Sequence, residues 1–320
     1  MKRKVYVTRK LPDVIVERLS ETCEIRMWEE EERPVPREVL EEEIKDVDGL
    51  YCLLTEQIDA PLLDRADKLK VIANMAVGYN NIDIDAAKER GVTVTNTPGV
   101  LTETTADLTF SLLMATARRI PEASEYLRNG EWKTWSPMQL TGQDIHGATL
   151  GIIGLGRIGE AVAKRAKGFD MKVLYHNRSQ NREAEGRLEL HYTELHTLLR
   201  ESDFVCVLTP FTPETKNMID KEELDRMKES AIIINTARGG IVNEKALYDA
   251  LKEKSIWAAG LDVFEEEPVS LNHPLLSLPN LVTLPHIGSA SIATRMKMAD
   301  LAATNLLDVL AGGDPPNKVV

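Results

Sequence analysis

The chain has 320 residues, 43% hydrophobic and 28% charged, which is the composition of a folded globular protein with mass for two domains of ~150 residues. Its 51 Asp and Glu residues outnumber 39 Lys and Arg, and the net charge of -12 would repel nucleic acid and anionic membrane surfaces. The sequence has no apolar run near the ~18 residues of a membrane span. We therefore expect a small-molecule partner, and neither a nucleic-acid nor a membrane partner.

The first third of the chain alternates β-rich runs with charged segments that suit helices. The runs cover residues 5–7, 24–28, 49–54, 71–74 and 92–96. Five strands alternating with helices predict a parallel α/β sheet. Pro12 and Pro36 suit the first turns of two of the helices. Asp83 can cap a helix over residues 84–90, and Gly91 can end that helix in the left-handed conformation.

Two longer helical patterns follow, over residues 101–119 and over residues 290–310. Between them lie six further strand candidates, at residues 149–154, 172–177, 204–208, 231–235, 258–263 and 281–285. Six is the strand number of a complete doubly wound sheet that binds a dinucleotide. The rest of the chain is therefore predicted to form a second parallel sheet.

The N-terminus and the cysteines predict a cytoplasmic protein. Residues 1–10 alternate charged side chains with Val and Tyr, whereas a signal peptide needs an unbroken apolar stretch. Cys23, Cys52 and Cys206 lie far apart in strand-like surroundings, as buried thiols of a reducing compartment do. Because no cysteines are neighbours and the six histidines lack partners at short helical spacing, we expect no metal site.

The strand candidate at 149–154 runs directly into a G-x-G-x-x-G motif and then into a helical pattern at 161–167. In such a motif Gly154 permits the tight turn, Gly156 lets the backbone approach a pyrophosphate, and Gly159 lets the helix pack on its strand. A glycine-rich turn that binds nothing is the alternative, which the strand and helix on either side disfavour. We expect the cofactor phosphates at the helix N-terminus, against Gly154, Leu155, Gly156, Arg157, Ile158 and Gly159.

The end of the next strand candidate lacks the acid that an NAD-binding sheet places about 20 residues after its glycine motif to bind the ribose. Asn177, Arg178 and Ser179 offer a neutral amide, a cation and a hydroxyl there. A carboxylate would repel a 2′-phosphate and these groups would not, so the sequence favours NADP(H), with NAD(H) as the second option. A solvated loop is the alternative, because arginine is common on surfaces.

Arg238, Glu267 and His286 each follow a strand candidate, at the edge where open α/β sheets bind ligands. A guanidinium can hold a carboxylate and polarise a carbonyl, and an imidazole can protonate the oxygen while a nicotinamide gives a hydride. Glu267 would orient the imidazole and favour its protonated form. Singly, the three residues also suit a helix cap, a solvated turn and a structural histidine. Together, after a nucleotide motif, they favour interconversion of 2-keto and 2-hydroxy acids.

From about residue 50 onward the chain resembles the D-isomer-specific 2-hydroxyacid dehydrogenases, especially the glyoxylate/hydroxypyruvate reductases and the related 2-ketogluconate (2-ketoaldonate) reductases. The matching stretches are residues 154–159, 235–240, 261–268 and 285–288. The resemblance implies that Arg238, Glu267 and His286 are catalytic, with His286 as proton donor. It implies cofactor contacts also from Thr104, Pro210, Thr236, Ala237, Asp262 and Gly288, with Asp262 on the nicotinamide carboxamide. It implies substrate contacts from Arg238, His286 and the backbone amides of Val77 and Gly78.

The resemblance also implies an architecture of two doubly wound parallel-sheet domains, with a Rossmann coenzyme domain inserted into a flavodoxin-like substrate domain. Residues 1–98 and 287–320 would form the substrate domain and residues 99–286 the dinucleotide-binding domain, with the site at the hinge. A homodimer through the coenzyme domains is expected. The apolar segment 132–137, with Trp135, either reaches the substrate pocket of the partner subunit or packs in the core.

Two positions depart from the family pattern. Asn177 replaces an acid, and this difference concerns only the choice of cofactor. Many members carry a histidine before the proline, where this chain has Leu208, Thr209 and Pro210, and we have no functional interpretation of that difference. The expected activity is NADPH-dependent reduction of glyoxylate and hydroxypyruvate to D-2-hydroxy acids. Reduction of 2-ketogluconate is an alternative, because it has the same α-keto carboxylate. A nucleotide-sensing corepressor is disfavoured by the complete Arg, Glu and His set and by the lack of a basic patch.

Overall fold

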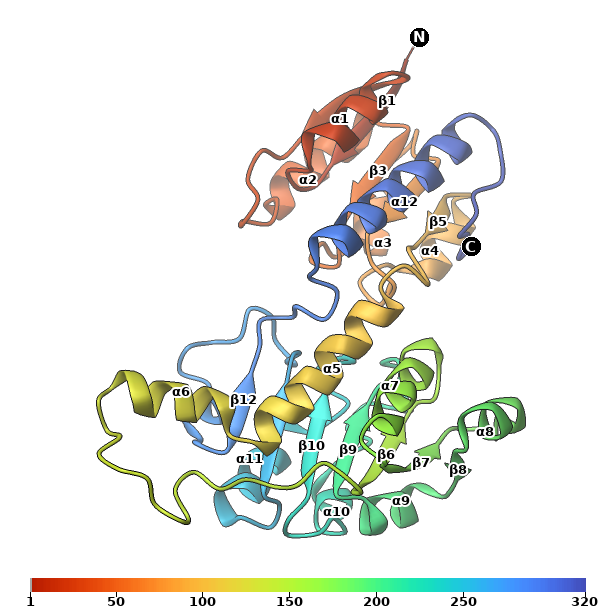
Figure 1. The fold of residues 1–320 in the computed structure, drawn as a ribbon. Coiled ribbons are helices and arrows are strands. Elements are labelled where there is room, and N and C mark those ends of the chain that lie inside the picture. The colour runs from red at the N-terminus through yellow and green to blue at the C-terminus, as the bar shows by residue number, and fades with distance from the viewer. Residues whose placement is uncertain (1) are drawn as a thin grey trace. The chain divides into compact units, whose positions relative to one another are not determined.

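The computed structural model of the protein describes residues 2–320 (Figure 1). The chain divides into two compact units. The first unit comprises the residues through Leu101 together with Ala290–Val320, and the second unit comprises Thr102–Ser289. The predicted division, at residues 98 and 286, also gave each part a role: one part binds the substrate and the other binds the cofactor. These two roles stay predictions.

The first unit is built on a five-stranded sheet of order β2-β1-β3-β4-β5, in which all neighbours are parallel. Its strands are β1 (Arg3–Val7), β2 (Cys23–Met27), β3 (Gly49–Cys52), β4 (Val71–Asn74) and β5 (Thr93–Thr95). The five predicted strands are therefore confirmed. Their spatial order is that of the flavodoxin-like doubly wound sheet.

The helices of the first unit are α1 (Asp13–Ser20), α2 (Arg37–Glu43), the 3₁₀ turn Ile44–Asp46, α3 (Ala60–Leu63), α4 (Ile84–Glu89) and α12 (Ile292–Leu310). Asp83 caps α4 by accepting a hydrogen bond from the backbone N of Ala86, and Gly91 has a φ of +66°, both as predicted. Pro12 and Pro36 are instead the residues just before α1 and α2, where their extended ψ angles of 138° and 145° keep them out of the first turn. Small residues of α12 pack against Tyr51 and Val71 in the core.

The second unit is built on a seven-stranded parallel sheet of order β12-β11-β10-β9-β6-β7-β8. Its strands are β6 (Thr149–Ile153), β7 (Lys172–His176), β8 (His191–Tyr192), β9 (Phe204–Val207), β10 (Ile232–Asn235), β11 (Ala258–Leu261) and β12 (Leu281–Thr283). All six predicted strands are confirmed. The prediction missed β8, because two residues are too few for a periodic pattern. Counted from β6, the strands β8-β7-β6-β9-β10-β11 follow the Rossmann order 3-2-1-4-5-6, and β12 is an additional strand.

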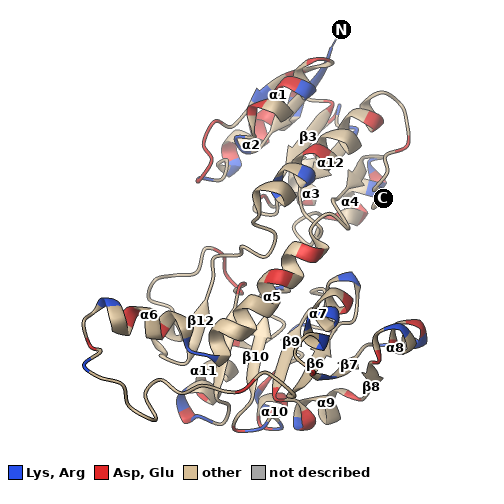
Figure 2. Cartoon of the chain, in the orientation of Figure 1, with Lys and Arg blue, Asp and Glu red and all other residues tan. Residues whose placement is uncertain are grey.

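The helices of the second unit are α5 (Thr102–Ala117), α6 (Ile120–Arg128), α7 (Arg157–Lys167), α8 (Arg182–Leu188), α9 (Leu195–Glu201), α10 (Lys221–Leu224), α11 (Glu244–Glu253) and the 3₁₀ turn Pro274–Ser277. Figure 2 shows the charged residues mainly on helices and loops, whereas β9 and β10 are uncharged and fully buried. The prediction missed α6. The backbone turns left-handed at Arg119, with a φ of 52°, and α6 then begins with a proline in its first turn.

The three cysteines are buried and free. Burial raises the pKa of the Cys206 thiol to about 12, so this group stays protonated and unreactive at neutral pH. Among residues 2–320, no helix combines the length and the apolar character that crossing a bilayer requires.

Candidate active site

The glycine motif forms the turn between β6 and α7. Gly154 has a φ of +99°, and a Cβ there would lie 2.5 Å from the backbone N of Thr209, so only glycine fits. A Cβ on Gly159 would lie 2.6 Å from the carbonyl oxygen of Gly154, and α7 therefore packs directly on the turn. A Cβ on Gly156 would meet nothing within 4 Å. The turn thus leaves open space in front of the first amide groups of α7, as a bound pyrophosphate requires.

Asn177 follows β7, and its side chain is bound to the glycine turn. Its Oδ1 accepts a hydrogen bond of 2.7 Å from the backbone N of Leu155, and its Nδ2 donates one of 3.2 Å to the backbone O of the same residue. Arg178 and Ser179, the next two residues, are exposed. The amide of Asn177 therefore ties the turn to the end of β7, a contact that no local sequence pattern signals. Its predicted place beside the ribose stays a prediction.

Arg238 lies in a turn after β10 that the side chain of Asn235 holds. The Oδ1 of Asn235 accepts from the backbone N of Ala237 at 3.0 Å, and its Nδ2 donates to the backbone O of Arg238 at 2.9 Å. A Cβ on Gly239 would lie 1.9 Å from the carbonyl carbon of Phe264. The turns after β10 and β11 therefore pack backbone against backbone, and Gly239 is what permits it.

The guanidinium of Arg238 is largely desolvated. Burial lowers the pKa of Arg238 from its ordinary value, and the negative charge of Glu267 opposes the shift. The Nη1 atom donates a hydrogen bond of 2.7 Å to the backbone O of Ala237. Because a guanidinium is too weak an acid to lose its proton in a protein, the group keeps its charge at neutral pH. A desolvated cation of this kind binds a carboxylate more strongly than a cation in open water does.

Glu267 and His286 form a close pair, with 2.6 Å between Oε2 and Nδ1. The other carboxylate oxygen accepts from the backbone N of Phe264 at 3.0 Å. Burial raises the pKa of Glu267, but the hydrogen bond and charge of His286 outweigh it, and the pKa is lowered overall. With Nδ1 on the carboxylate, Nε2 is the ring nitrogen that can give a proton to a ligand.

The backbone of His286 is held in an uncommon conformation. Its φ is +54°, which costs a residue other than glycine about 1 kcal/mol or more. Its backbone N donates a hydrogen bond of 2.9 Å to the backbone O of Asp262. Asp262 also accepts, through Oδ1, from the backbone N of Ile287 at 2.7 Å. These two bonds hold the histidine turn against the end of β11.

The second carboxylate oxygen of Asp262, Oδ2, is buried and has no hydrogen-bond partner within residues 2–320. Only 1% of the residue is exposed, and burial raises the pKa of Asp262, with the hydrogen bond from Ile287 opposing the shift. A Cβ on Gly288 would lie 3.2 Å from Oδ2. An unpaired buried acceptor costs ~1–3 kcal/mol, which an amide N–H from a ligand would remove. This orphaned oxygen fits the carboxamide of a nicotinamide.

The remaining predicted contacts are distributed over both units. In the second unit, Thr104 is in the first turn of α5, Pro210 is exposed after β9, and Thr236 lies 2.7 Å, Oγ1 to Oγ1, from Thr109 of α5. Val77 and Gly78 belong to the first unit and follow β4. The second unit therefore brings Arg238, Glu267, His286 and Asp262 together at the carboxyl ends of β10, β11 and β12.

Comparison with known proteins identifies the chain. The family model described as D-isomer specific 2-hydroxyacid dehydrogenase, NAD binding domain, matches residues 110–288. The chain belongs to this dehydrogenase family. It is 51% identical over 320 residues to a glyoxylate reductase of Korarchaeum cryptofilum, and the alignment covers 100% of this chain and 96% of that protein. It is 50% identical over 323 residues to a glyoxylate reductase of Pyrococcus horikoshii, with coverages of 100% and 96%.

Solved structures support the same assignment. A protein from Thermus thermophilus matches with a TM-score of 0.93 and 47% identity, over 99% of this chain and 100% of that one. An NADPH-dependent glyoxylate/hydroxypyruvate reductase from Sinorhizobium meliloti, in complex with NADP and malonate, matches with a TM-score of 0.85 and 35% identity, over 100% and 97%. The predicted family and fold are therefore confirmed, and the protein is an NAD(P)-dependent oxidoreductase.

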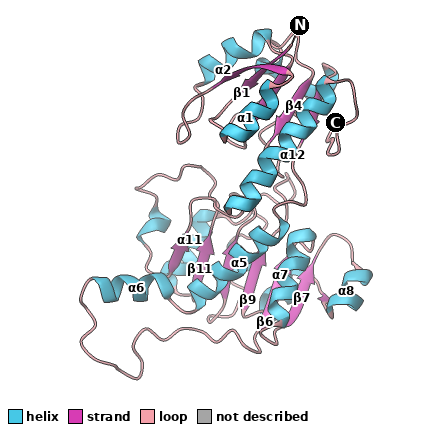
Figure 3. Cartoon of the chain, turned by 45° about the horizontal axis from the view of Figure 1, so that its top comes forward, coloured by secondary structure: helices cyan, strands magenta, loops and turns pink. Residues whose placement is uncertain are grey.

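The dehydrogenase exposes apolar side chains on α6 and on the long loop between α6 and β6. Figure 3 shows this loop without helix or strand. Trp135 is 76% exposed and Met138 is 75% exposed. Ile120, Leu127 and Trp132 are exposed as well. The alternative that residues 132–137 pack in the core is therefore wrong for this chain.

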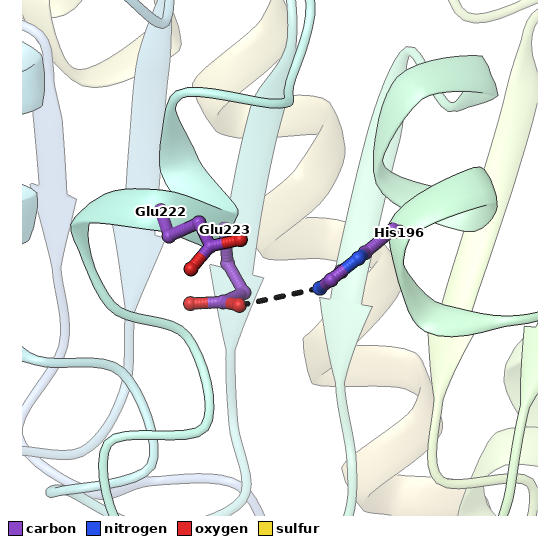
Figure 4. A group of neighbouring side chains, drawn as sticks. All are labelled: His196, Glu222 and Glu223. Carbon is purple, nitrogen blue, oxygen red and sulfur yellow. Dashed lines mark ion pairs between the residues drawn. The ribbon is translucent and has the colours of Figure 1, made fainter.

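Within residues 2–320, one group of His and acidic side chains is close enough to approach a cation, namely His196 of α9 with Glu222 and Glu223 of α10 (Figure 4). The Nε2 of His196 lies 3.5 Å from Oε1 of Glu223. Glu223 also accepts from the backbone N of Asp220 in a capping box, and Glu222 pairs with Arg226 at 2.6 Å. Both carboxylates thus have partners within the dehydrogenase itself, and we do not propose a metal site here.

Proposed function

We propose that the protein reduces small 2-keto acids, above all glyoxylate and hydroxypyruvate, to D-2-hydroxy acids with NADPH. The pair of Glu267 and His286, 2.6 Å apart, carries the proposal, because it presents a proton donor at the sheet edge where the cofactor is expected. The full-length similarity to glyoxylate reductases at about 50% identity supports this class of substrate.

In the proposed reaction the keto carbon accepts a hydride and the keto oxygen accepts a proton. When bound, the nicotinamide supplies the hydride. His286 donates the proton from Nε2, and Glu267 holds the ring and stabilises its charged form. Arg238 binds the carboxylate and polarises the carbonyl, and the backbone amides of Val77 and Gly78 also bind the carboxylate.

The chain's own residues would hold the cofactor at three points. The turn from Gly154 to Gly159 would bind the pyrophosphate at the N-terminus of α7. The unpaired Oδ2 of Asp262 would accept from the carboxamide. Arg178 and Ser179 would contact the 2′-phosphate of NADPH.

The substrate is tested by steady-state rates with NADPH and glyoxylate, hydroxypyruvate or 2-ketogluconate. We expect kcat/KM to be highest for glyoxylate or hydroxypyruvate. A higher kcat/KM for 2-ketogluconate would assign the protein to the 2-ketoaldonate reductases. No turnover of any of the three substrates would overturn the proposal.

The choice of cofactor is tested at Arg178. Wild-type protein should have a larger kcat/KM with NADPH than with NADH, and Arg178→Ala should lower this ratio by roughly tenfold, the loss expected for one charge-assisted contact. Arg200, also exposed, lies in the last turn of α9, and Arg200→Ala serves as the control that should leave the ratio unchanged. A wild-type ratio below one would defeat the assignment to NADPH.

We also propose a cytoplasmic homodimer in which α6 and the following loop contact the partner, with Trp135 reaching the partner's substrate pocket. Exposed aromatic side chains such as Trp135 are typical of interfaces, and free buried thiols suit a reducing compartment. Sedimentation equilibrium should give twice the chain mass of 35.7 kDa. A double variant, Trp135→Ser with Met138→Ser, should shift the equilibrium toward the monomer; a wild-type monomer at micromolar concentration would contradict the proposal.

A further inference from the structure

Three consecutive carbonyl groups in the segment after β4 are hydrogen-bonded by donors of the first unit. The backbone N of Thr97 donates to Ala76, Nδ2 of Asn96 donates to Val77, and Nδ2 of Asn74 donates to Gly78, each at 2.9 Å. Thr97 and Asn74 have no exposed surface. At least the first and the third of these carbonyls therefore point to the buried side of the segment.

The direction of the carbonyls determines the direction of the amide N–H groups. A trans peptide unit is planar, so the C=O of one residue and the N–H of the next point in opposite directions. The N–H groups of Val77, Gly78 and Tyr79 must then point away from the three donors. Among residues 2–320, none of these three N–H groups has a hydrogen-bond partner. Val77 and Gly78 are partly exposed and Tyr79 is 41% exposed, so the segment lies at the surface of the first unit.

The two asparagines lie at the same edge of the sheet. Asn74 is the last residue of β4, and Asn96 follows β5 directly. The strands are parallel and paired in register, with Ala73 opposite Thr95, so both side chains start from the carboxyl edge where open α/β sheets bind ligands. Successive backbone N–H groups on one side of a segment form a concave anion site, or nest.

We propose that Asn74 and Asn96 are positioning residues that hold the segment 76–79 as a nest for the carboxylate of the 2-keto acid. The side-chain amide of Asn74 binds the carbonyl of Gly78 and so turns the N–H of Tyr79 toward the ligand. The side-chain amide of Asn96 binds the carbonyl of Val77 and so turns the N–H of Gly78 the same way. The nest then has three donors, because Tyr79 adds a third amide to those of Val77 and Gly78. This inference rests on the proposed function, since the carboxylate belongs to the proposed substrate.

The experiment uses the full-length variants Asn96→Ala and Asn74→Ala, each of which removes one amide donor without adding a charge. Oxamate, a keto-acid analogue that cannot be reduced, serves as the probe for the carboxylate site in the presence of NADPH. We expect the KM for glyoxylate and the Kd for oxamate to rise roughly tenfold or more in each variant. The fall in kcat should be smaller than the rise in KM, and the KM for NADPH should not change.

A matched control is Asn280→Ala. Asn280 likewise donates from Nδ2 to two backbone carbonyls, those of Leu251 and Trp257, both at 3.1 Å in the second unit. This variant should keep the wild-type KM for glyoxylate and the wild-type Kd for oxamate. It therefore distinguishes the loss of stability that follows from removing any such amide from a loss of carboxylate binding at the segment 76–79.

Each asparagine variant decides the inference by itself, so a failure of Asn74→Ala to fold leaves Asn96→Ala as the test. A folded variant with wild-type KM for glyoxylate and wild-type Kd for oxamate would overturn the inference, as would a loss confined to kcat. If wild-type protein neither reduces keto acids nor binds oxamate, the proposed function itself fails. Wild-type activity with unaffected variants removes only the positioning role.

Discussion

Replacing His286 by alanine is expected to lower kcat for the reduction of glyoxylate by roughly 10²–10⁴-fold, the usual contribution of a general acid. The imidazole is held by Glu267 through Nδ1, and without it the keto oxygen receives its proton only from water. The Kd for NADPH should change little, because the proposed cofactor contacts come from the glycine turn and from Oδ2 of Asp262 and not from the imidazole. Single-turnover absorbance at the nicotinamide band measures the chemical step directly.

Another histidine–glutamate pair of the same unit provides the control for this prediction. Nε2 of His273 lies 3.1 Å from Oε2 of Glu244, so His273→Ala removes the same kind of pair and leaves the proposed proton donor in place. We expect this variant to keep kcat within a few-fold of wild type. If His286→Ala kept it equally well, another group would have to supply the proton, and the proposed role of the Glu267 pair would be wrong.

Replacing Arg238 by alanine is expected to raise the KM for the keto acid and to lower kcat, the latter by roughly 10²–10³-fold, as removal of a group that stabilises a developing oxyanion does. Both constants change because the guanidinium contacts the substrate in the ground state and in the transition state. Desolvation strengthens these contacts, since burial already lowers the pKa of Arg238. Arg238→Lys should recover little, because an ammonium group cannot make the two parallel hydrogen bonds of a guanidinium.

The control for Arg238 is Arg226→Ala, which removes an arginine that pairs with Glu222 at 2.6 Å just after α10. This variant should keep wild-type kinetics, because an exposed ion pair contributes only ~0–1 kcal/mol to stability. Thermal unfolding of Arg238→Ala must be cooperative for the kinetic result to count. A folded Arg238→Ala enzyme with unchanged kcat/KM for glyoxylate would remove the arginine from the mechanism.

The sheets could be predicted from the sequence because their signals are local. Central strands such as β9 and β10 are buried on both faces and are therefore continuous apolar runs bounded by polar segments. The cap of α4 at Asp83 and the stop at Gly91 are likewise encoded by single residues. The two-residue strand β8 and the helix α6 escaped prediction, because the pairing with β7 and the left-handed Arg119 before α6 depend on contacts that short windows do not contain.

The sequence by itself determined the two doubly wound sheets, the family, and which residue types stand at the ends of β6, β10, β11 and β12, since strand and turn signals extend over only a few residues. Only the tertiary structure decided what those residues touch. Asn177 binds the backbone of Leu155, Gly239 lies against the backbone of Phe264, and Oδ2 of Asp262 is left unpaired. Asn74 and Asn96 bind consecutive carbonyls although they belong to the ends of two different strands. Such contacts depend on the packing of neighbouring strands, and no spacing along the chain encodes them.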